Sequence, residues 1–338
     1  MAKLRISLTP TIRKIEVFTK RFITTNFIGS YKSVFKGHGL EFGGYKLYGP
    51  GDDSRLIDWK ATLRANEVLI KEFSEERQLN IFLLIDVSSS MVFGSTQKLK
   101  SEYAGELAAS LCYAVLEADD AVGFALFSDK VTKVYSPVKS NRQFYLLLRE
   151  LVNLKNYGGG YNLNKALEFM MSCLKSNSIL IIISDFIGLG GKWQELLKVA
   201  AGKFDVIGIM VRDPRDRTLP AMNNNVLVED PFSKKQLLIC PEAIKEKYKK
   251  YVNRQENTLK DIFKNMGASF ISLSTDEDFS RPILKYFGTR SSRTDIILPN
   301  ISEGSSAMVI TLPQEVDILR PSVPSSISTV KMSCWGIL

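Results

Sequence analysis

Histidine and paired cysteines are nearly absent from this sequence of 338 residues. It contains one histidine, His38, and four cysteines that lie far apart and form no Cys-x-x-Cys pair. Without such pairs a zinc site or a disulfide framework is not expected, and a reducing, cytoplasmic location fits best. A histidine-rich metal site is excluded. A Ser-His-Asp or Cys-His triad would have to use His38, which lies in a glycine-rich segment far along the chain from every candidate nucleophile.

Long apolar runs and nucleotide-binding motifs are also missing. No stretch approaches the ~20 apolar residues that span a bilayer, so we expect no transmembrane segment. The basic start of the chain, MAKLRISLTPTIRKIEVFTKRF, lacks the apolar core of a secretory signal. It faintly resembles an organelle transit peptide, and a cationic surface helix is the preferred interpretation. There is no Gly-x-x-x-x-Gly-Lys-Ser/Thr motif, and Gly158–Gly160 is not a Gly-x-Gly-x-x-Gly fingerprint, so neither a P-loop nor a dinucleotide site is expected.

The excess of positive charge, +9 in total, is spread along the chain. Lysines and arginines are mixed with acidic residues and form no long basic run, which favours an ordinary solvated surface over a nucleic-acid-binding face. Nucleic acid is therefore not the expected partner. Peripheral contact with an anionic membrane surface stays open as an alternative.

The chain divides into three regions, 1–79, 80–288 and 289–338. The first carries a helical stretch at about 9–27 and then a loop rich in Gly, Asp and Tyr from Gly37 to Asp53. The last is rich in Ser, Pro and Ile, and we expect a weakly ordered or surface-docked tail.

The middle region alternates strand-like and helix-like segments. Continuous apolar runs, which are typical of buried parallel strands, occupy 80–86, 121–128, 178–185 and 204–211. Helical spacing follows at 101–118, about 140–155, 162–175, 193–201 and about 242–266. The remaining segments are a short edge strand at 133–136, a turn with a two-strand excursion at 219–240, a strand at 268–273 and a closing helix at 276–287. This alternation predicts an α/β fold with a doubly wound, mostly parallel sheet, an amino-terminal helical or loop extension and a small β insertion.

Hard oxygen ligands gather where two predicted strands end. Asp86, Ser88 and Ser90 alternate along the loop that leaves the first strand, and Asp185 ends the third apolar run. In doubly wound sheets ligands bind at the carboxyl ends of the strands, so these side chains are expected to meet. One or two carboxylates with two hydroxyls suit Mg²⁺ or Mn²⁺. The alternative is that the serines only cap the following helix.

The segments LLIDVSSSM, DDAVGFALFS, GGGYNLNKAL and IIISDF resemble the successive motifs of von Willebrand factor A domains with a metal-ion-dependent adhesion site. The resemblance implies that Asp86, Ser88, Ser90 and Asp185 hold the ion. Tyr161, with Asn162 beside it, stands where the family has a threonine ligand. Either Asn162 or a water fills the position, or the metal binds weakly or not at all.

A second resemblance lies upstream, in GHGLEFGGYKLYGPGDDSRLIDWKATLRANEVLIKEFSEER. This segment is similar to the signature of a bacterial family catalogued as domain of unknown function 58, which joins it to a von Willebrand factor A-like domain. The later VRDPRDRTLP also matches that family, and the likeness extends from about 31 to 287. Lys46 and Leu63 stand where Arg and Ala are usual.

The signature concentrates six residues of interest in one turn-rich stretch, namely Glu41, Asp52, Asp53, Arg55, Asp58 and Trp59. In a structural interpretation, Asp52 or Asp53 caps a helical turn. Arg55 then pairs with a carboxylate and Trp59 packs under the loop. The alternatives are a partner-binding surface, for which exposed Arg, Trp and Tyr are good anchors, and a catalytic acid pair.

The leading functional hypothesis is a non-enzymatic adaptor that recognises partner carboxylates through the metal. The family resemblance implies a MoxR-type AAA+ ATPase as partner, in chaperone-like maturation of client proteins. One alternative is a metal-dependent hydrolase using the same carboxylates, which would need a general base that the sequence does not show. The other is a binder of nucleic acid or an anionic membrane surface, with steeply salt-dependent binding.

Overall fold

The computed structural model describes residues 41–49, 51–65, 67–74, 79–176, 178–222 and 224–291. The helical stretch expected at 9–27 and nearly all of the tail expected at 289–338 lie outside these residues.

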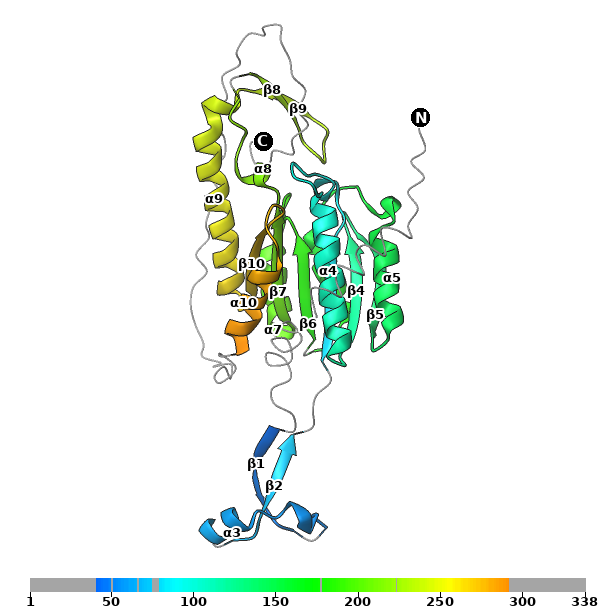
Figure 1. The fold of residues 1–338 in the computed structure, drawn as a ribbon, viewed down its shortest axis with the longest axis vertical. Helices are drawn as coiled ribbons and strands as arrows, with labels where there is room; N and C mark the ends of the chain where they lie inside the picture. Colours follow the sequence, from blue (N-terminus) through cyan, green and yellow to red (C-terminus); the bar gives the residue numbers. More distant parts are fainter. Residues whose placement is uncertain are drawn as a thin grey trace.

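A six-stranded sheet forms the centre of the molecule, with the strand order β10-β7-β6-β3-β4-β5 (Figure 1). Its strands are β3 (Asn80–Asp86), β4 (Ala121–Phe127), β5 (Val131–Val138), β6 (Ile179–Ser184), β7 (Asp205–Arg212) and β10 (Ser269–Ser274). All neighbouring pairs are parallel except β4 and β5. Within this sheet, β3, β4 and β5 lie side by side in chain order, and β6 then pairs with the opposite edge of β3. The predicted doubly wound, mostly parallel α/β fold is confirmed, with its switch in strand order between β3 and β6.

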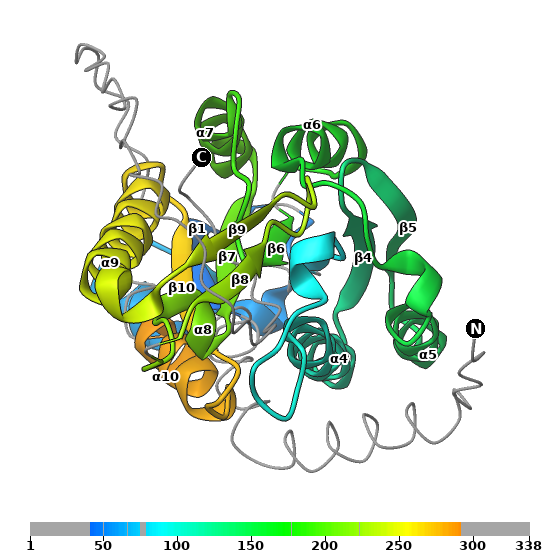
Figure 2. The same cartoon turned by 90° about the horizontal axis from the view of Figure 1, so that it is seen from above.

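Helices cover both faces of this sheet (Figure 2). One face carries α4 (Lys100–Glu117), α5 (Asn141–Leu151) and α10 (Ser280–Ser291), and the other carries α6 (Leu163–Cys173), α7 (Trp193–Lys203) and α9 (Pro241–Asn265). Alternate residues of β3 enter the two cores: Leu83 joins the first and Leu84 the second, both fully buried. Burial on both faces explains why this strand is an unbroken apolar run.

The predicted two-strand excursion is a hairpin of β8 (Val226–Glu229) and β9 (Gln236–Ile239). It packs with Tyr248 and Val252 of α9 in a small third core. A short helix, α8 (Pro214–Arg217), lies between β7 and this hairpin along the chain.

The amino-terminal segment contains more regular structure than the sequence predicts. The prediction of a loop at 37–53 is wrong for Glu41–Leu47. These residues form β1, which pairs antiparallel with β2 (Leu69–Ser74). The 3₁₀ turn η1 (Ser54–Leu56) and helix α3 (Trp59–Ala65) connect the two strands. Two adjacent glycines in β1 explain why the sequence did not predict a strand there. They lie at a β-bulge, where the register shifts between Phe42 and Gly44 and Gly44 has a φ of +147°.

The closing helix α10 begins at Ser280 and not at 276 as predicted. The Asp278 carboxylate accepts a hydrogen bond from the Ser280 amide (3.0 Å), which favours the start of the helix at that residue.

Across the part of the chain that the structure describes, no helix has the length and apolar content required to cross a bilayer.

Gly208 in β7 is a position where packing fixes the residue type. A Cβ there would lie 2.4 Å from the Phe263 ring, which is buried beneath β7. Gly208→Ala is therefore expected to lower the free energy of unfolding by about 1–3 kcal/mol through overpacking. Gly202→Ala, in α7 with nothing near its Cβ, should leave stability equal or higher by up to about 1 kcal/mol. Urea unfolding of both variants makes the comparison, and equal stabilities would contradict it.

Candidate functional site at the carboxyl edge of the sheet

Asp86 joins the ends of the two strands that flank the switch point. It is the last residue of β3 and is 1% exposed. Its Oδ1 accepts a hydrogen bond from the Ser88 amide (2.8 Å), which bends the chain as it leaves the strand. Its Oδ2 accepts one from the Ser184 hydroxyl at the end of β6 (2.7 Å). Both carboxylate oxygens therefore have partners, and the loops after β3 and β6 are held together.

The hydroxyls of Ser88 and Ser90 meet 3.1 Å apart and are fully buried. Ser88 precedes the 3₁₀ turn η2 (Ser89–Met91), but its side chain makes no capping hydrogen bond. The interpretation of these serines as mere helix caps is therefore wrong. Two hydroxyl oxygens converge beside a carboxylate, as the sequence predicts.

The glycine run supports this loop through its backbone. The Gly158 amide donates to the Val87 carbonyl (2.8 Å), and the Ser89 amide donates to the Gly159 carbonyl (3.1 Å). Gly159 has a φ of +83°, in the left-handed region that favours glycine. The run thus positions the serine loop.

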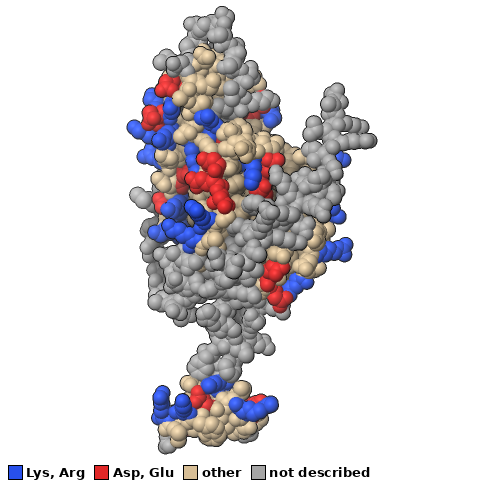
Figure 3. All heavy atoms as spheres, viewed as in Figure 1, with Lys and Arg blue, Asp and Glu red and all other residues tan. Residues whose placement is uncertain are grey.

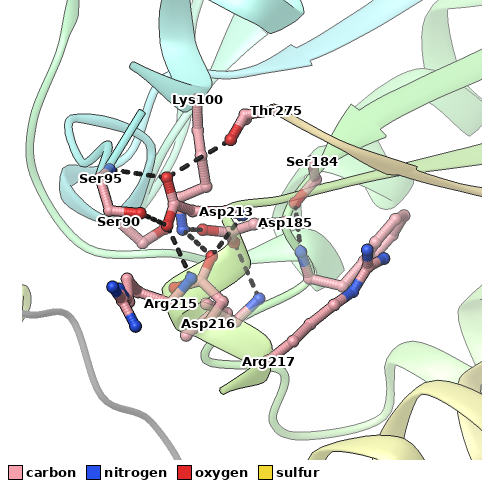
Figure 4. A network of polar contacts seen from close by, with 12 residues as sticks. Ser90, Ser95, Lys100, Ser184, Asp185, Asp213, Arg215, Asp216, Arg217 and Thr275 are labelled. Atoms are coloured by element: carbon pink, nitrogen blue, oxygen red, sulfur yellow. Dashed lines mark hydrogen bonds and ion pairs between the residues drawn. The ribbon is translucent and has the colours of Figure 1, made fainter. Parts of the chain in front are cut away.

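Asp185 lies at the same edge but is held by an internal cation. Its Oδ2 accepts a hydrogen bond from Nζ of Lys100 (2.8 Å), the first residue of α4, and the same Nζ donates to Asp216 Oδ2 in α8 (2.9 Å) (Figure 4). All three side chains are at most 1% exposed. Burial lowers the pKa of a lysine, but the two carboxylates outweigh burial and raise the pKa of Lys100 above its ordinary value.

Local backbone geometry directs Asp185 inward. Its Oδ1 accepts a hydrogen bond from the Ile187 amide (2.9 Å), and Phe186 between them has a φ of +52°. A phenylalanine in this region is strained and persists only where its surroundings fix it. Here the Phe186 ring packs edge-on against Phe263 in the second core (5.5 Å between centroids), which holds the turn.

Tyr161 lies beside the cluster, whereas Asn162 serves a different purpose. The Tyr161 hydroxyl is 3.3 Å from the Ser184 hydroxyl, and burial together with the nearby Asp86 raises its pKa. Asn162 caps α6 by accepting a hydrogen bond from the Lys165 amide (3.1 Å). The phenol, and not the carboxamide, therefore stands at the position where the family resemblance expects a threonine.

The electrostatics of the edge follow from this crowding of carboxylates. Burial, reinforced by Asp185, raises the pKa of Asp86 to about 7. A divalent ion beside Asp86 would favour its charged form.

Two aspartates in the segment after β7 were not predicted as members of this network. Asp213 accepts hydrogen bonds from the Ser95 amide (2.7 Å) and hydroxyl (2.5 Å) and from the Thr275 hydroxyl (3.3 Å). It forms a capping box with Asp216 at the start of α8. The spacing Asp-Pro-x-Asp in the sequence could have predicted this capping box. Lys100 gave no such signal, because a lysine in the first turn of a helix ordinarily reaches solvent.

Arg212 is a second buried cation near the cluster. It is 2% exposed, and among the residues that the structure describes its Nε and Nη2 find no hydrogen-bond acceptor. Its charge is close enough to lower the pKa of Tyr161, against the larger effect of burial. A buried guanidinium with unmet donors favours an acceptor such as a water or an incoming anion.

The signature residues upstream form their own network. Asp53 caps η1 and pairs with Arg55 (2.9 Å), and Asp52 accepts from Lys46 (2.8 Å). Asp58 caps α3 through the Lys60 amide (3.0 Å). These contacts match the structural interpretation of the turn.

Two signature residues stand apart from that network. Trp59 is 66% exposed, so the expectation that it packs under the loop is wrong. Glu41 begins β1. The side-chain hydrogen bonds given above for Asp52, Asp53 and Asp58 all have partners within the segment from β1 to α3.

The oxygen atoms at this edge meet only part of what a divalent ion requires. Asp86, Ser88 and Ser90 supply oxygen atoms of the kind that Mg²⁺ and Mn²⁺ prefer. Asp185 does not complete the set, since Lys100 occupies its Oδ2. Within the described ranges no group of three or more His, Cys, Asp or Glu residues is placed to hold a metal. The trio fits an ion, but the ion would be held with one carboxylate and not two.

Lys100 is expected to be essential to the fold. Lys100→Met would leave Asp185 and Asp216 buried without a counter-charge, which should cost about 3–5 kcal/mol of unfolding free energy. Lys98→Met is the matched control, because its ion pair with Glu106 is partly exposed and should be worth about 1 kcal/mol or less. Urea unfolding measures both, and losses of similar size would contradict the role assigned to Lys100.

Asp86 should impose a pH dependence on stability in the presence of a chelator. The folded chain keeps the Asp86 proton up to a pKa of about 7, whereas an unfolded chain releases it near a pKa of about 3.9. Between these values the folded state binds more protons, so its stability falls as pH rises from about 4 to about 7. Asp86→Asn has no proton to release, so the fall in wild type should exceed that in the variant by up to about 4 kcal/mol. Parallel stability profiles would count against the raised pKa.

Comparisons with known proteins agree with the signature segment. The family described as Protein of unknown function DUF58 matches residues 44–258. The uncharacterized protein Rv1480 of Mycobacterium tuberculosis is 26% identical over 286 residues, which are 84% of this chain and 90% of that protein. The uncharacterized protein YeaD of Bacillus subtilis is 28% identical over 118 residues, which are 35% of this chain and 27% of that protein.

Solved structures with a similar arrangement include the conserved hypothetical protein BatB from Bacteroides thetaiotaomicron (TM-score 0.42, 17% identity, 64% of this chain and 98% of that one). An aerotolerance-related membrane protein from Bacteroides fragilis gives a TM-score of 0.44 at 15% identity, over 64% of this chain and all of that one. The von Willebrand factor type A structure from Catenulispora acidiphila gives 0.38 at 11% identity, over 66% of this chain and 43% of that one.

The family match extends over more than half of the chain, from the amino-terminal hairpin into α9. This protein belongs to the family described as Protein of unknown function DUF58.

Proposed function

We propose that this protein is a non-enzymatic interaction module that receives an acidic side chain of a partner protein at the edge formed by Asp86, Ser88 and Ser90. The observation that carries the proposal is the convergence of the two serine hydroxyls, 3.1 Å apart, beside a carboxylate at the switch point of the sheet. Mg²⁺ or Mn²⁺ bound there would supply the positive charge that a partner carboxylate needs. The residues of the chain hold and orient this contact.

The Lys100 ion pair makes cooperative binding the expected behaviour. Because Asp185 is neutralised by Lys100, the chain offers the ion one acidic ligand, and affinity for hard cations depends on the number of charged ligands. A partner carboxylate would add the second charge. The ion and the partner should therefore each raise the affinity of the chain for the other. The unmet donors of Arg212 also favour an anion near this edge.

The alternative of a metal-dependent hydrolase has less support. A pKa of about 7 would suit Asp86 to act as a general base. However, Asp86 is also the carboxylate that would hold the ion of such a hydrolase, and a carboxylate that ligates the ion is not free to act as the general base. An adaptor needs no such proton transfer.

A MoxR-type AAA+ ATPase is the partner that we assign to this adaptor, with client proteins as the third component. This assignment is supported by the family resemblance of the signature segment and by the absence of a P-loop motif from the sequence. The ATPase would supply the energy of remodelling, and this chain would connect it to its clients. A cytoplasmic site of action fits such a partnership.

Mn²⁺ binding in the presence of a carboxylate probe tests the edge itself. We expect Mn²⁺ titration of the purified chain to show tighter binding when a short acetylated peptide with one glutamate is added, and no such gain with the matched glutamine peptide. Ser88→Ala/Ser90→Ala should weaken Mn²⁺ binding by roughly tenfold or more, because loss of even an outer-shell partner of a metal ligand typically costs about 10–100-fold in affinity. Ser110→Ala, which alters a serine buried in α4, is the matched control. Unchanged Mn²⁺ affinity in the double variant would overturn the proposal.

A further inference from the structure

A hollow of about 560 Å³ opens beside the site, and the proposed function does not use it. It is lined by the segment Thr96–Lys98 before α4, by Tyr103 in α4, and by the loop Thr275–Phe279 after β10. The Asp213 carboxylate connects the two walls, since it accepts hydrogen bonds from Ser95 on one side and Thr275 on the other. The hollow is therefore fixed to the same edge of the sheet as the Asp86 cluster.

The hollow is strongly acidic, in contrast to the net charge of +9 of the whole chain. The exposed residues Asp276, Glu277 and Asp278 form one rim, and acidic side chains gather in the middle of this face of the molecule (Figure 3). Lys98 is the one basic residue in the lining, and its ammonium group is paired with the Glu106 carboxylate (2.6 Å). The rim thus carries an excess of negative charge.

Tyr103 provides an independent indication that a ligand belongs here. Its side chain is 3% exposed, and its hydroxyl has no hydrogen-bond partner among the residues that the structure describes. A buried hydroxyl without a partner is costly and rare in folded proteins. The ring is fixed edge-on against Phe279 (5.5 Å between centroids), so the hydroxyl cannot readily turn away. Burial and then the charges of Asp278, Glu277 and Asp276 raise the pKa of Tyr103, which places the hydroxyl in the field of the acidic rim.

The chemistry of the lining selects an organic cation over a metal ion. Within the described ranges these carboxylates do not converge in a metal-binding group. Two of them are held apart by local hydrogen bonds: Asp276 accepts from the Ser274 hydroxyl, and Asp278 accepts from the Ser280 amide. Each keeps free lone pairs for a donor that can reach several acceptors at once. A planar guanidinium with five N–H donors meets this requirement better than an ammonium group.

We propose that the hollow between Thr96–Lys98 and Thr275–Phe279 binds an arginine side chain of a partner protein, with the Tyr103 hydroxyl and the carboxylates of Glu277 and Asp278 as acceptors. The chain then offers two contacts of opposite sign at one edge: the hollow takes a basic side chain, and the Asp86 edge takes an acidic one. The hollow needs no metal, so its function does not depend on the proposed function.

The probe that tests this proposal is the capped pentapeptide Gly-Ser-Arg-Ser-Gly, compared with the matched peptide in which neutral citrulline replaces arginine. Amide chemical shifts of the full chain are measured by NMR during the titration. The arginine peptide should shift the amides of 96–98 and 275–279 with a dissociation constant of about 1 mM or tighter, while the citrulline peptide should not. Added salt should weaken the contact. Absence of arginine-specific shifts at these amides would overturn the proposal.

Variants separate a built site from general charge attraction. Tyr103→Phe removes a hydroxyl that has no partner in the fold, so stability should be retained while the arginine peptide binds roughly tenfold more weakly. Glu277→Gln/Asp278→Asn should weaken binding by at least as much, and Asn can still cap α10. Glu117→Gln, which alters an exposed acid at the end of α4, is the charge-matched control and should bind as wild type does. Equal binding by wild type and Tyr103→Phe would contradict the assigned role of the hydroxyl.

A final variant distinguishes this inference from the proposed function. Ser88→Ala/Ser90→Ala should weaken Mn²⁺ binding and leave binding of the arginine peptide unchanged. Tyr103→Phe should weaken binding of the arginine peptide and leave Mn²⁺ binding unchanged. Joint loss of both activities in either variant would show that the hollow is not an independent site.

Discussion

The ammonium group of Lys100 connects three parts of the chain that are distant in sequence. Its carboxylate partners lie 85 and 116 residues further along, directly after β6 and in α8. In a fully buried setting the attraction offsets the cost of removing three charges from water only because the groups are paired and hydrogen-bonded. Through this contact the first turn of α4, the loop after β6 and the segment after β7 take fixed positions around the edge of the sheet. The geometry of both the serine cluster and the acidic hollow depends on that arrangement.

The same contact changes what the resemblance to adhesion-site domains implies. A site with two available carboxylates would hold a divalent ion by itself, but here one carboxylate is already satisfied by a positive charge that the chain carries. The serine loop is also held by backbone hydrogen bonds to the glycine run, and Asp86 is held by the Ser184 hydroxyl; these bonds need no ion. The edge is thus organised before any ligand arrives, which reduces the entropy that binding must overcome.

Much of the fold could be predicted from the sequence, because the central strands are buried on both faces and appear as unbroken apolar runs. The convergence of Asp86, Ser88 and Ser90 also followed from their spacing at the end of such a run. What failed depended on contacts between distant segments. β1 contains adjacent glycines that read as a loop, and its partner strand begins at Leu69. The burial of Lys100 is set by carboxylates far along the chain, so a local pattern could not reveal it.

The edge strand β5 has a consequence for how this protein can assemble. It runs antiparallel to its neighbour, its register shifts near both ends, and its sequence includes Lys133 and Pro137. A proline lacks the amide that a further strand would need, and a lysine opposes close packing of a second sheet, so this border resists continuation by another chain. Two copies of the chain are therefore not expected to pair edge to edge through β5 as a continuous sheet. On that side, a partner protein can instead contact the loops at the ends of the strands.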